Sequence, residues 1–451
     1  MSSSFQTALL NELSRLPQEG GGIYRVYHFA TKPVICKYPI ELSGGGTFSQ
    51  SSMIHRLILI AHGSTNLESP AFVCGMEVME YKEKSTDHEP SLVYISKVDT
   101  SGYKAPAPIT SLMVKTYLST HSNCTTHIFA RAQPQYLFHR SVENPSKHAQ
   151  SDRGLIAWWL RVITDTSFLT KLDAWWCIPG VDDQESAKRE TRVTQDLKLG
   201  QVNWHYGYSY DDNADPKAVI PKFPDDAKAR LLKSYANYDS KDDSDEEEDD
   251  DEDDAEEGGE GDDGKDENDT KGDETPSSPM NNNDASSDDE SDEGSTKQAA
   301  SNPGKIKDIL ADESHSMTVR EFWELLSIGE ECGSGKLTGF FVIKGDPAAK
   351  ESGEFKELAQ TLSKDQFTVI WNHLMACEFT SDESNRTSTA KFTAQINECL
   401  QLESGYLPIE ATPSGESNAE INKPKRPLQQ EKPSAPTVNV LGGSFIKRRK
   451  T

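Results

Sequence analysis

The sequence predicts a mixed α/β fold, because strand-like and helical patterns alternate over most of its 451 residues. Apolar runs such as HRLILIAHG (55–63) are typical of buried strands. Segments such as FQTALLNELSRL (5–16) repeat apolar residues at helical spacing. The tract between Asp239 and Glu293 shows neither pattern. We therefore expect a folded body interrupted by a segment that does not join it.

The strand-like runs share apolar side chains that alternate or run continuously between turn residues. Before the tract they are residues 23–34, 55–63, 72–82, 91–104 and the start of 127–138. Residues 202–212 are rich in aromatic side chains without a clear period, so we expect irregular structure there. After the tract, a strand-like run is predicted to close the segment 317–345.

The helical patterns share apolar residues three and four positions apart. They are residues 5–16, 111–120, 154–176, 223–238, the first part of 317–345, one or two helices in 354–377, and 393–403. Residues 184–200 are polar and are predicted to be helical or loose. In 223–238 a proline and two aspartates at the start suit the first turn of a helix and its dipole.

The acidity of the chain is concentrated in one place. The tract holds 29 of the 74 Asp and Glu residues against three lysines, while the whole chain has a net charge of −27, so the remainder is close to neutral. Such a composition buries too little apolar surface to fold. We predict an N-terminal part (1–238), a disordered acidic insertion (239–305), a C-terminal part of the same body (306–405) and a disordered basic tail (406–451). A separate C-terminal domain is the alternative.

The cysteines and the targeting signals of the chain indicate the compartment in which the protein works. The seven cysteines show no metal-ligand spacing, which favours free thiols in a reducing compartment over a zinc site or disulfide framework. The start of the chain lacks the apolar core of a leader, and no run is long enough for a membrane helix. We expect a soluble intracellular protein. Basic clusters at 423–426 and 445–451 indicate a nuclear address, with a solubilising tail as the alternative.

Side chains suited to chemistry gather in three clusters. Lys97 and Asp99 end a strand, the stretch 131–159 combines cations with aromatics, and FPDDAKAR occupies 223–230. Phosphate-loop, metalloprotease and serine-hydrolase motifs are absent. Cations suit phosphates, and carboxylates beside aromatics suit a cationic guest. If the clusters converge, they suit transfer from a phosphorylated carrier to a basic acceptor; if not, they are surface loops, caps and ion pairs.

A set of short motifs, in a fixed order, carries a family resemblance. The motifs are ISKVDTSGY (95–103), RAQPQYLF (131–138), SKH (146–148) before LIAWW (155–159), IPG (178–180) and FPDDAKAR (223–230). On these motifs the chain resembles the fungal-type histone H3 lysine acetyltransferases known as the regulator of Ty1 transposition family. Weaker similarity lies at SMTVREFWELL (316–326) and in the basic C-terminus. The resemblance implies a central β-sheet surrounded by helices, in the acetyltransferase fold of the CREB-binding-protein type.

The resemblance also implies roles for individual residues. The catalytic, acceptor-side residues would be Asp99, Tyr136, Trp159, Asp225 and Asp226. The acetyl-CoA side would comprise Lys97, Phe129, Ala130, Arg131, Gln133, Lys147, His148 and Trp158. Lys228 matches a lysine that family members acetylate on themselves. We assign the aspartates to steering and desolvating the acceptor ammonium rather than to proton abstraction, because no glutamate stands out as a general base. Tyr136 would hydrogen-bond the thioester or protonate the leaving thiolate.

The function implied by the resemblance is transfer of acetyl from acetyl-CoA to lysines of newly made histone H3 in H3–H4. It implies a nuclear enzyme of replication-coupled nucleosome assembly, transcription regulation and the DNA damage and repair response. Its partners would be H3–H4 and histone chaperones of the anti-silencing and nucleosome-assembly-protein-like types. No metal, membrane or sequence-specific nucleic acid is expected.

Two other classes of function stay open from the sequence. A non-enzymatic acidic histone chaperone or scaffold would use the acidic tract but would not need the three clusters. A small-molecule acyltransferase would use the cofactor side but neither the tract nor the basic tail. The tract itself is either a solvated linker or a segment that engages histones or shields the basic tail. Between Thr120 and His127 the chain has only a short link where relatives carry a long basic loop, so control by such a loop is in doubt.

Overall fold

The computed structural model describes most of the two parts of the chain that flank the acidic tract. The described residues are 5–17, 22–37, 39–40, 50–63, 69–83, 92–166, 172–193, 202–239, 317–329, 332, 335–345, 359–400 and 408–413. The predicted acidic insertion lies outside them apart from Asp239, and the predicted basic tail lies outside them apart from residues 408–413.

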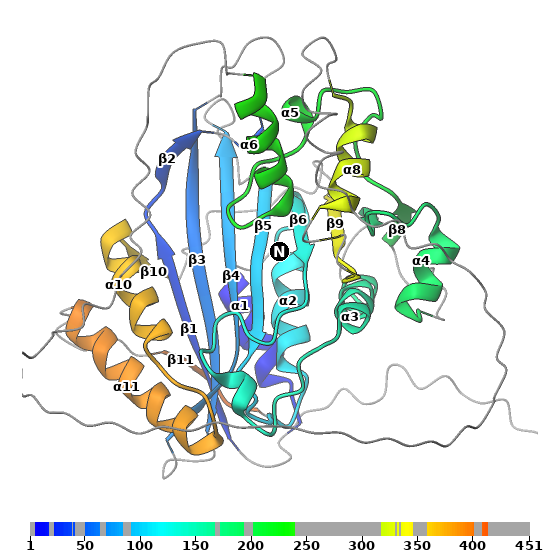
Figure 1. Ribbon diagram of the computed structural model, residues 1–451. Helices are drawn as coiled ribbons and strands as arrows, with labels where there is room; N and C mark the ends of the chain where they lie inside the picture. Colours follow the sequence, from blue (N-terminus) through cyan, green and yellow to red (C-terminus); the bar gives the residue numbers. More distant parts are fainter. Residues whose placement is uncertain are drawn as a thin grey trace, which may run out of the picture.

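The described residues form one mixed sheet of 11 strands (Figure 1). The strands are β1 (Ile23–Thr31), β2 (Val34–Lys37), β3 (Gln50–Gly63), β4 (Ala71–Glu83), β5 (Leu92–Thr100), β6 (Thr125–Ala130), β7 (Leu172–Cys177), β8 (Val202–Tyr206), β9 (Gly339–Lys344), β10 (Gln360–Leu362) and β11 (Ile409–Ala411). Their order is β10-β1-β3-β4-β5-β6-β9-β7-β8, with β2 also paired to β3 and β11 to β1. Strand β9, which follows the acidic tract in sequence, lies between β6 and β7. Both sides of the tract therefore contribute to one sheet.

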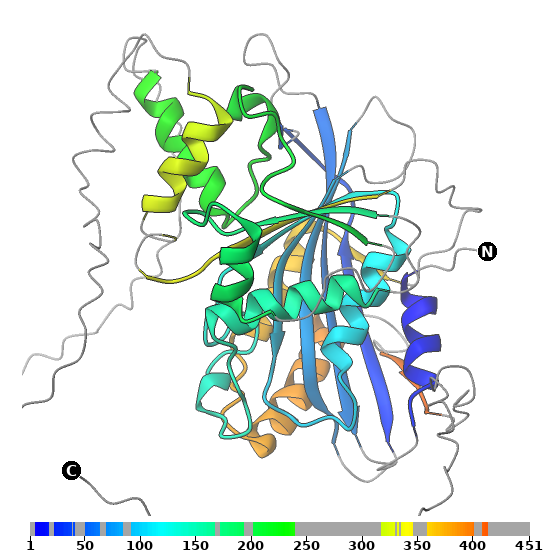
Figure 2. The same ribbon diagram turned by 90° about the vertical axis from the view of Figure 1, so that its right-hand side faces the viewer.

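Helices cover both faces of the sheet, which confirms the predicted mixed α/β class with a central sheet (Figures 1 and 2). They are α1 (Phe5–Ser14), α2 (Ile109–Thr120), α3 (Asp152–Thr164), α4 (Gln184–Thr191), α5 (Pro216–Val219), α6 (Ala227–Asp239), α8 (Val319–Ile328), α10 (Lys364–Met375) and α11 (Asp382–Leu400). Alternate side chains of a strand point to opposite faces. In β3, Ile58 and Ile60 therefore pack into the core with α1, α2 and α3, whereas Leu57 and Leu59 pack into the core with α10 and α11.

A buried asparagine fastens α11 to the sheet beside the end of β5. The Asn385 side-chain oxygen accepts the backbone N–H of Phe72 at 2.9 Å, and its nitrogen donates to the Phe72 carbonyl at 2.9 Å. The same nitrogen donates to Ser101 Oγ at 2.9 Å. Because a buried amide must find partners, this contact fixes both the register of α11 and the segment that follows Thr100.

A buried ion pair connects the sheet to α2. Arg56 donates to both oxygens of Glu80 at 2.6 and 2.8 Å, and the Tyr117 hydroxyl donates to Glu80 at 2.6 Å. Burial alone would raise the pKa of Glu80, but Arg56 and His121 hold it well below its usual range. The carboxylate therefore stays ionised and links β3, β4 and α2, whose first turn reaches the site described below.

The sequence prediction of secondary structure is wrong in two strands. Residues 154–176 were expected to be one helix, but α3 ends at Thr164 and residues 172–177 form β7. The alternation of buried Leu172, Ala174 and Trp176 has a period of two, but the segment is too short to stand out from the helical pattern before it. Residues 202–212 were expected to be irregular, but Val202–Tyr206 forms β8 and pairs in parallel with β7. Strand pairing, which local pattern does not report, decides both cases.

Two predicted helices near the C-terminus also have different bounds. The segment 354–377 contains the short strand β10 before α10, and α10 begins after a capping box formed by Ser363 and Gln366. The helix expected at 393–403 is the end of α11, which begins at Asp382. Its first half packs through small polar side chains such as Asn385 and Thr389, so no apolar period marked it.

Candidate active site

A cavity opens where two parallel strands separate. Strands β5 and β6 pair only from Leu92 to Ile95 of β5, and beyond Ile95 they diverge. A cavity of about 280 Å³ lies between their carboxyl ends, the usual place for a ligand in sheets with parallel strands. Its lining comprises residues 95–100, Pro108, Thr110, Ser111, Phe129, Ala130, 132–134, Tyr136, 147–150, Leu155, Trp158 and Trp159. Two of the three clusters singled out in the sequence therefore meet in one cavity.

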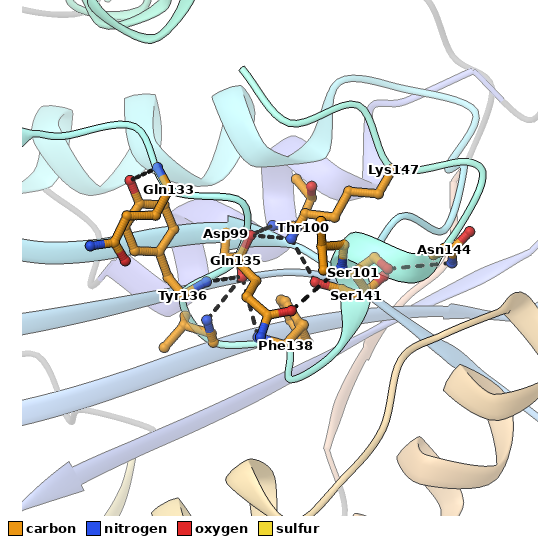
Figure 3. Close-up of polar contacts among 12 residues, drawn as sticks. Asp99, Thr100, Ser101, Gln133, Gln135, Tyr136, Phe138, Ser141, Asn144 and Lys147 are labelled. Atoms are coloured by element: carbon orange, nitrogen blue, oxygen red, sulfur yellow. Dashed lines mark hydrogen bonds and ion pairs between the residues drawn. The ribbon is translucent and has the colours of Figure 1, made fainter. Parts of the chain in front are cut away.

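The buried carboxylate of Asp99 joins the walls of this cavity (Figure 3). Its Oδ2 accepts the backbone N–H groups of Tyr136, Leu137 and Phe138 at 2.8, 2.9 and 3.2 Å. Its Oδ1 accepts the N–H of Thr100 and the ammonium of Lys147, both at 2.8 Å. The Asp99 side chain is 5% exposed, so these bonds lie away from water. Asp99 thus holds the loop after β6 against the end of β5.

Lys147 completes this arrangement from the loop before α3. Its side chain is 4% exposed, and its ammonium donates to Ser141 Oγ at 2.6 Å as well as to Asp99. The loop lies so close to Gly102 that a Cβ there would stand 2.8 Å from Asn144 and 3.0 Å from Lys147, and Gly102 has a φ of +94°. Only glycine fits this position. A contact between Lys147 and a cofactor phosphate, as the resemblance implied, would compete with the Asp99 pair.

Tyr136 and the tryptophan pair form the aromatic walls. The Tyr136 hydroxyl donates to the carbonyl of Arg131 and accepts the N–H of Gln133 at 3.0 Å. Burial is the main cause that raises the pKa of Tyr136 to about 12. The rings of Trp158 and Trp159 meet edge to face with centroids 4.9 Å apart. The walls are therefore largely aromatic, and the phenolic proton of Tyr136 at the cavity is already donated to the Arg131 carbonyl.

The two aspartates of FPDDAKAR have opposite environments. Asp225 has a φ of 55°, its carboxylate is 73% exposed, and it pairs with the Lys97 ammonium at 3.3 Å. Asp226 is buried; it accepts the Lys228 backbone N–H at 2.9 Å and the Lys228 ammonium at 2.5 Å. Neither residue lines the cavity. The third cluster therefore adjoins the cavity through Lys97 rather than forming its wall.

Lys228 is buried beneath the C-terminal part of the chain. Its ammonium lies 4.6 Å from the centroid of the Phe340 ring, on β9, and 5.9 Å from that of Phe129. It lines a second, much smaller cavity with His127 and ten other residues. Burial, together with the nearby cation of Lys228, lowers the pKa of His127 to about 3, so that imidazole is neutral. Lys228 thus depends on one carboxylate, Asp226, and two aromatic faces.

The predicted cofactor-side residues are mostly found together. Those that line the cavity are Lys97, Phe129, Ala130, Gln133, Lys147, His148 and Trp158. Arg131 is not in the lining, although its carbonyl accepts the Tyr136 hydroxyl. His148 is exposed. The structure adds Thr110 and Ser111, because α2 begins after Pro108 without a side-chain cap and turns its first residues toward the cavity.

Sequence reasoning missed Glu77 of β4. Its carboxylate pairs with the Lys97 ammonium at 2.8 Å and with the His55 ring at 2.8 Å. The sequence did contain a signal for this pair, because Glu77 and Glu80 interrupt the mostly apolar run FVCGMEVMEYK (72–82). An acid in a buried strand is expected only where it has a partner. The other such acid, Glu80, pairs with Arg56 on the opposite side of the sheet.

Two kinds of feature are absent from the described residues. No group of His, Cys, Asp and Glu side chains in that part of the chain is placed to hold a metal ion. None of its helices has the length and apolar character needed to cross a membrane.

Comparison with known proteins places the chain in a class of acetyltransferases. A family model of the histone acetyltransferase KAT11-type domain matches residues 109–395, which is more than half of the chain. The chain therefore belongs to the KAT11-type histone acetyltransferases, a family of enzymes. This confirms the resemblance drawn from the short motifs.

Individual relatives agree with this assignment. The histone acetyltransferase rtt109 of Aspergillus flavus is 27% identical over 248 residues, which are 46% of this chain and 43% of that protein. The histone acetyltransferase rtt109 of Schizosaccharomyces pombe is 24% identical over 369 residues, 74% of each chain. The chain thus spans less than half of the first relative. The crystal structure of Rtt109 from Aspergillus fumigatus matches with a TM-score of 0.60 at 20% identity, over 90% of this chain and 98% of that one, which shows a shared fold.

Replacing Asp99 by alanine should destabilise the protein by about 3–5 kcal/mol, because it leaves the buried Lys147 ammonium and three loop N–H groups without their partner. Urea unfolding would measure the loss. Asp165→Ala is the matched control: it removes an acid whose exposed pair with Lys115 should contribute less than about 1 kcal/mol. Equal effects of the two substitutions would contradict the role given to Asp99.

Proposed function

We propose that the chain transfers acetyl from acetyl-CoA to lysine side chains of histone H3 in H3–H4. Family membership supplies the reaction class, and one observation carries the proposal: the cavity beside Tyr136 and Trp159 adjoins the exposed carboxylate of Asp225 through Lys97. A shielded cavity next to an exposed acid provides separate places for an acyl donor and a cationic acceptor.

The cavity suits the acetyl-pantetheine end of acetyl-CoA rather than the whole molecule. Its volume of about 280 Å³ is just below the range for small-ligand sites, roughly 300–1,000 Å³. The adenosine and phosphates would then lie at the rim. There the uncapped first turn of α2, with Thr110 and Ser111, offers backbone N–H groups to an anion, and His148 is exposed.

Asp225 is the carboxylate best placed to attract the acceptor lysine. Its side chain is mostly exposed, whereas Asp226 is buried and already bonded to Lys228. The acceptor ammonium must lose a proton before its nitrogen attacks the thioester. We assign Asp225 to steering that ammonium and Asp226 to holding Lys228 and the start of α6, where it caps the helix.

Tyr136 fits a hydrogen-bonding role better than that of a proton donor. A phenol with a pKa of about 12 is a weaker acid than a thiol, whose ordinary pKa is about 8.5. Complete transfer of the phenolic proton to the leaving thiolate would therefore be uphill by more than three pKa units. A hydrogen bond to the thioester oxygen or to the departing sulfur needs no such transfer; it needs only that the hydroxyl turn from the Arg131 carbonyl to the ligand.

The finer assignments follow from the family and are part of the same proposal. They comprise newly made H3–H4 as substrate, cooperation with histone chaperones of the anti-silencing and nucleosome-assembly-protein-like types, nuclear location, and roles in nucleosome assembly and the DNA damage response. The acidic tract, net negative over residues 239–293, offers the basic histones an electrostatic attraction that salt would weaken.

Purified protein incubated with labelled acetyl-CoA and H3–H4 should label H3. Asp225→Asn should lower kcat/KM for H3–H4 by about tenfold, the equivalent of roughly 1.4 kcal/mol, and leave the KM for acetyl-CoA unchanged. Asp182→Asn, which changes another exposed acid outside the cavity lining, is the control and should have no effect. Histone binding without transfer would contradict the proposal and favour a chaperone; transfer to small amines in preference to H3 would favour a small-molecule acyltransferase.

We further propose that the protein acetylates its own Lys228 when it is incubated with acetyl-CoA. Acetylation would remove the cation that neutralises Asp226 and would make that buried acid available to the site. Peptide mass spectrometry should find acetyl-Lys228, and Lys228→Arg should lower both acetyl-CoA affinity and turnover. Lys233→Arg, at an exposed position of the same helix, is the control. Unchanged affinity and turnover in Lys228→Arg would contradict a self-activating role.

A further inference from the structure

Four ionisable side chains form a continuous row from β3 to the turn that carries Asp225. The His55 ring nitrogen Nε2 lies 2.8 Å from Glu77 Oε1, and the Lys97 ammonium lies 2.8 Å from Glu77 Oε2. The same ammonium lies 3.3 Å from Asp225 Oδ2. Glu77 and Lys97 are directly paired in the register of β4 and β5, next to a shift in that register. The row therefore crosses three adjacent strands before it reaches the acceptor side.

Exposure rises from Glu77 to Asp225, so Glu77 is the most fixed of these three side chains. The side chain of Glu77 is 3% exposed, that of Lys97 22% and that of Asp225 73%. Burial alone would raise the pKa of Glu77, but His55 and Lys97 lower it, so the carboxylate is ionised. Burial alone would lower the pKa of Lys97, but Glu77 and Asp225 raise it. Glu77 and Lys97 thus keep opposite charges at neutral pH.

The backbone conformation of Asp225 is one that surrounding contacts help to hold. A φ of 55° is the left-handed region, which residues other than glycine adopt rarely, although aspartate enters it more readily than most. Its exposed carboxylate pairs with Lys97, a side chain from a strand in the middle of the sheet. Lys97 is itself confined, because its ammonium also lies 5.3 Å from the centroid of the Trp371 ring on α10.

We propose that Glu77 is a positioning residue of the acceptor side: it fixes Lys97, and Lys97 fixes the carboxylate of Asp225 where the acceptor ammonium arrives. This inference rests on the proposed function. It gives Lys97 an acceptor-side role in place of the cofactor-side role that the resemblance implied. The Lys97 ammonium is held between two carboxylates, so a CoA phosphate would have to compete with both of them for it.

Steady-state kinetics with each substrate varied in turn test the proposal. Glu77→Gln and Lys97→Met should each lower kcat/KM for H3–H4 by about fivefold or more, with the KM for acetyl-CoA within about twofold of the wild type. Lys97→Arg, which keeps the cation, should restore most of the loss. Lys188→Met is the matched control: that lysine has a side chain 21% exposed and pairs with an exposed acid on α4, so its loss should change neither constant.

A double-mutant cycle separates positioning from general destabilisation. Because Glu77 acts through Asp225, Glu77→Gln should have almost no further effect in an Asp225→Asn background. Additive effects would overturn the proposal. The proposal would also be overturned if Lys97→Met raised the KM for acetyl-CoA and left the kinetic constants for H3–H4 unchanged. That result would assign Lys97 to the cofactor side. If Glu77→Gln does not fold, the kinetics of Lys97→Met and Lys97→Arg are compared instead. A double-mutant cycle of Lys97→Met with Asp225→Asn then tests the same proposal.

A crystal structure of a variant tests this inference independently of the proposed function. If the wild-type protein acetylates nothing, the proposed reaction fails, and the crystal structure of Lys97→Met still tests the row. The proposal expects Asp225 to leave the left-handed region or its carboxylate to lose its fixed position in that variant. An unchanged Asp225 would show that Lys97 does not hold it.

Discussion

The buried carboxylate of Asp99 is the interaction on which the candidate site depends. Parallel strands that separate would leave loop N–H groups unpaired in the interior, and Asp99 accepts three of them from the segment after β6. Its charge would be costly to bury alone, and Lys147 balances it from a third segment. One side chain thereby stabilises the divergence of β5 and β6, and the cavity exists because of that divergence.

The site also depends on residues that follow the acidic tract. Strand β9 pairs with β6 and supplies Phe340, whose ring faces the Lys228 ammonium. Helix α11 supplies Asn385, which binds Ser101 just beyond Asp99. Helix α10 supplies Trp371 beside Lys97. Although the conspicuous motifs all precede the tract, the part of the chain beyond it buries and orients them, which accounts for a family match that extends to residue 395.

Part of this structure could be predicted from the sequence, and the rest could not for identifiable reasons. Apolar periodicity indicated the mixed α/β class, and the order of short motifs indicated the family. The partners of Asp99 could not be predicted, because they are backbone amides 37 to 39 residues away whose position only the folded loop determines. The sequence also could not predict that Asp225 is exposed and Asp226 buried, because two adjacent aspartates differ only in how the fold places them.

The central claim is that the cavity between β5 and β6 receives the acetyl-pantetheine end of acetyl-CoA while the Asp99–Lys147 pair stays intact. A crystal structure of the protein with acetyl-CoA tests it most directly. The account predicts the thioester beside Tyr136 and Trp159, the phosphates near Thr110 and Ser111 at the start of α2, and Lys147 still bonded to Asp99. A thioester bound outside this cavity, or Lys147 drawn away from Asp99 to a phosphate, would contradict it.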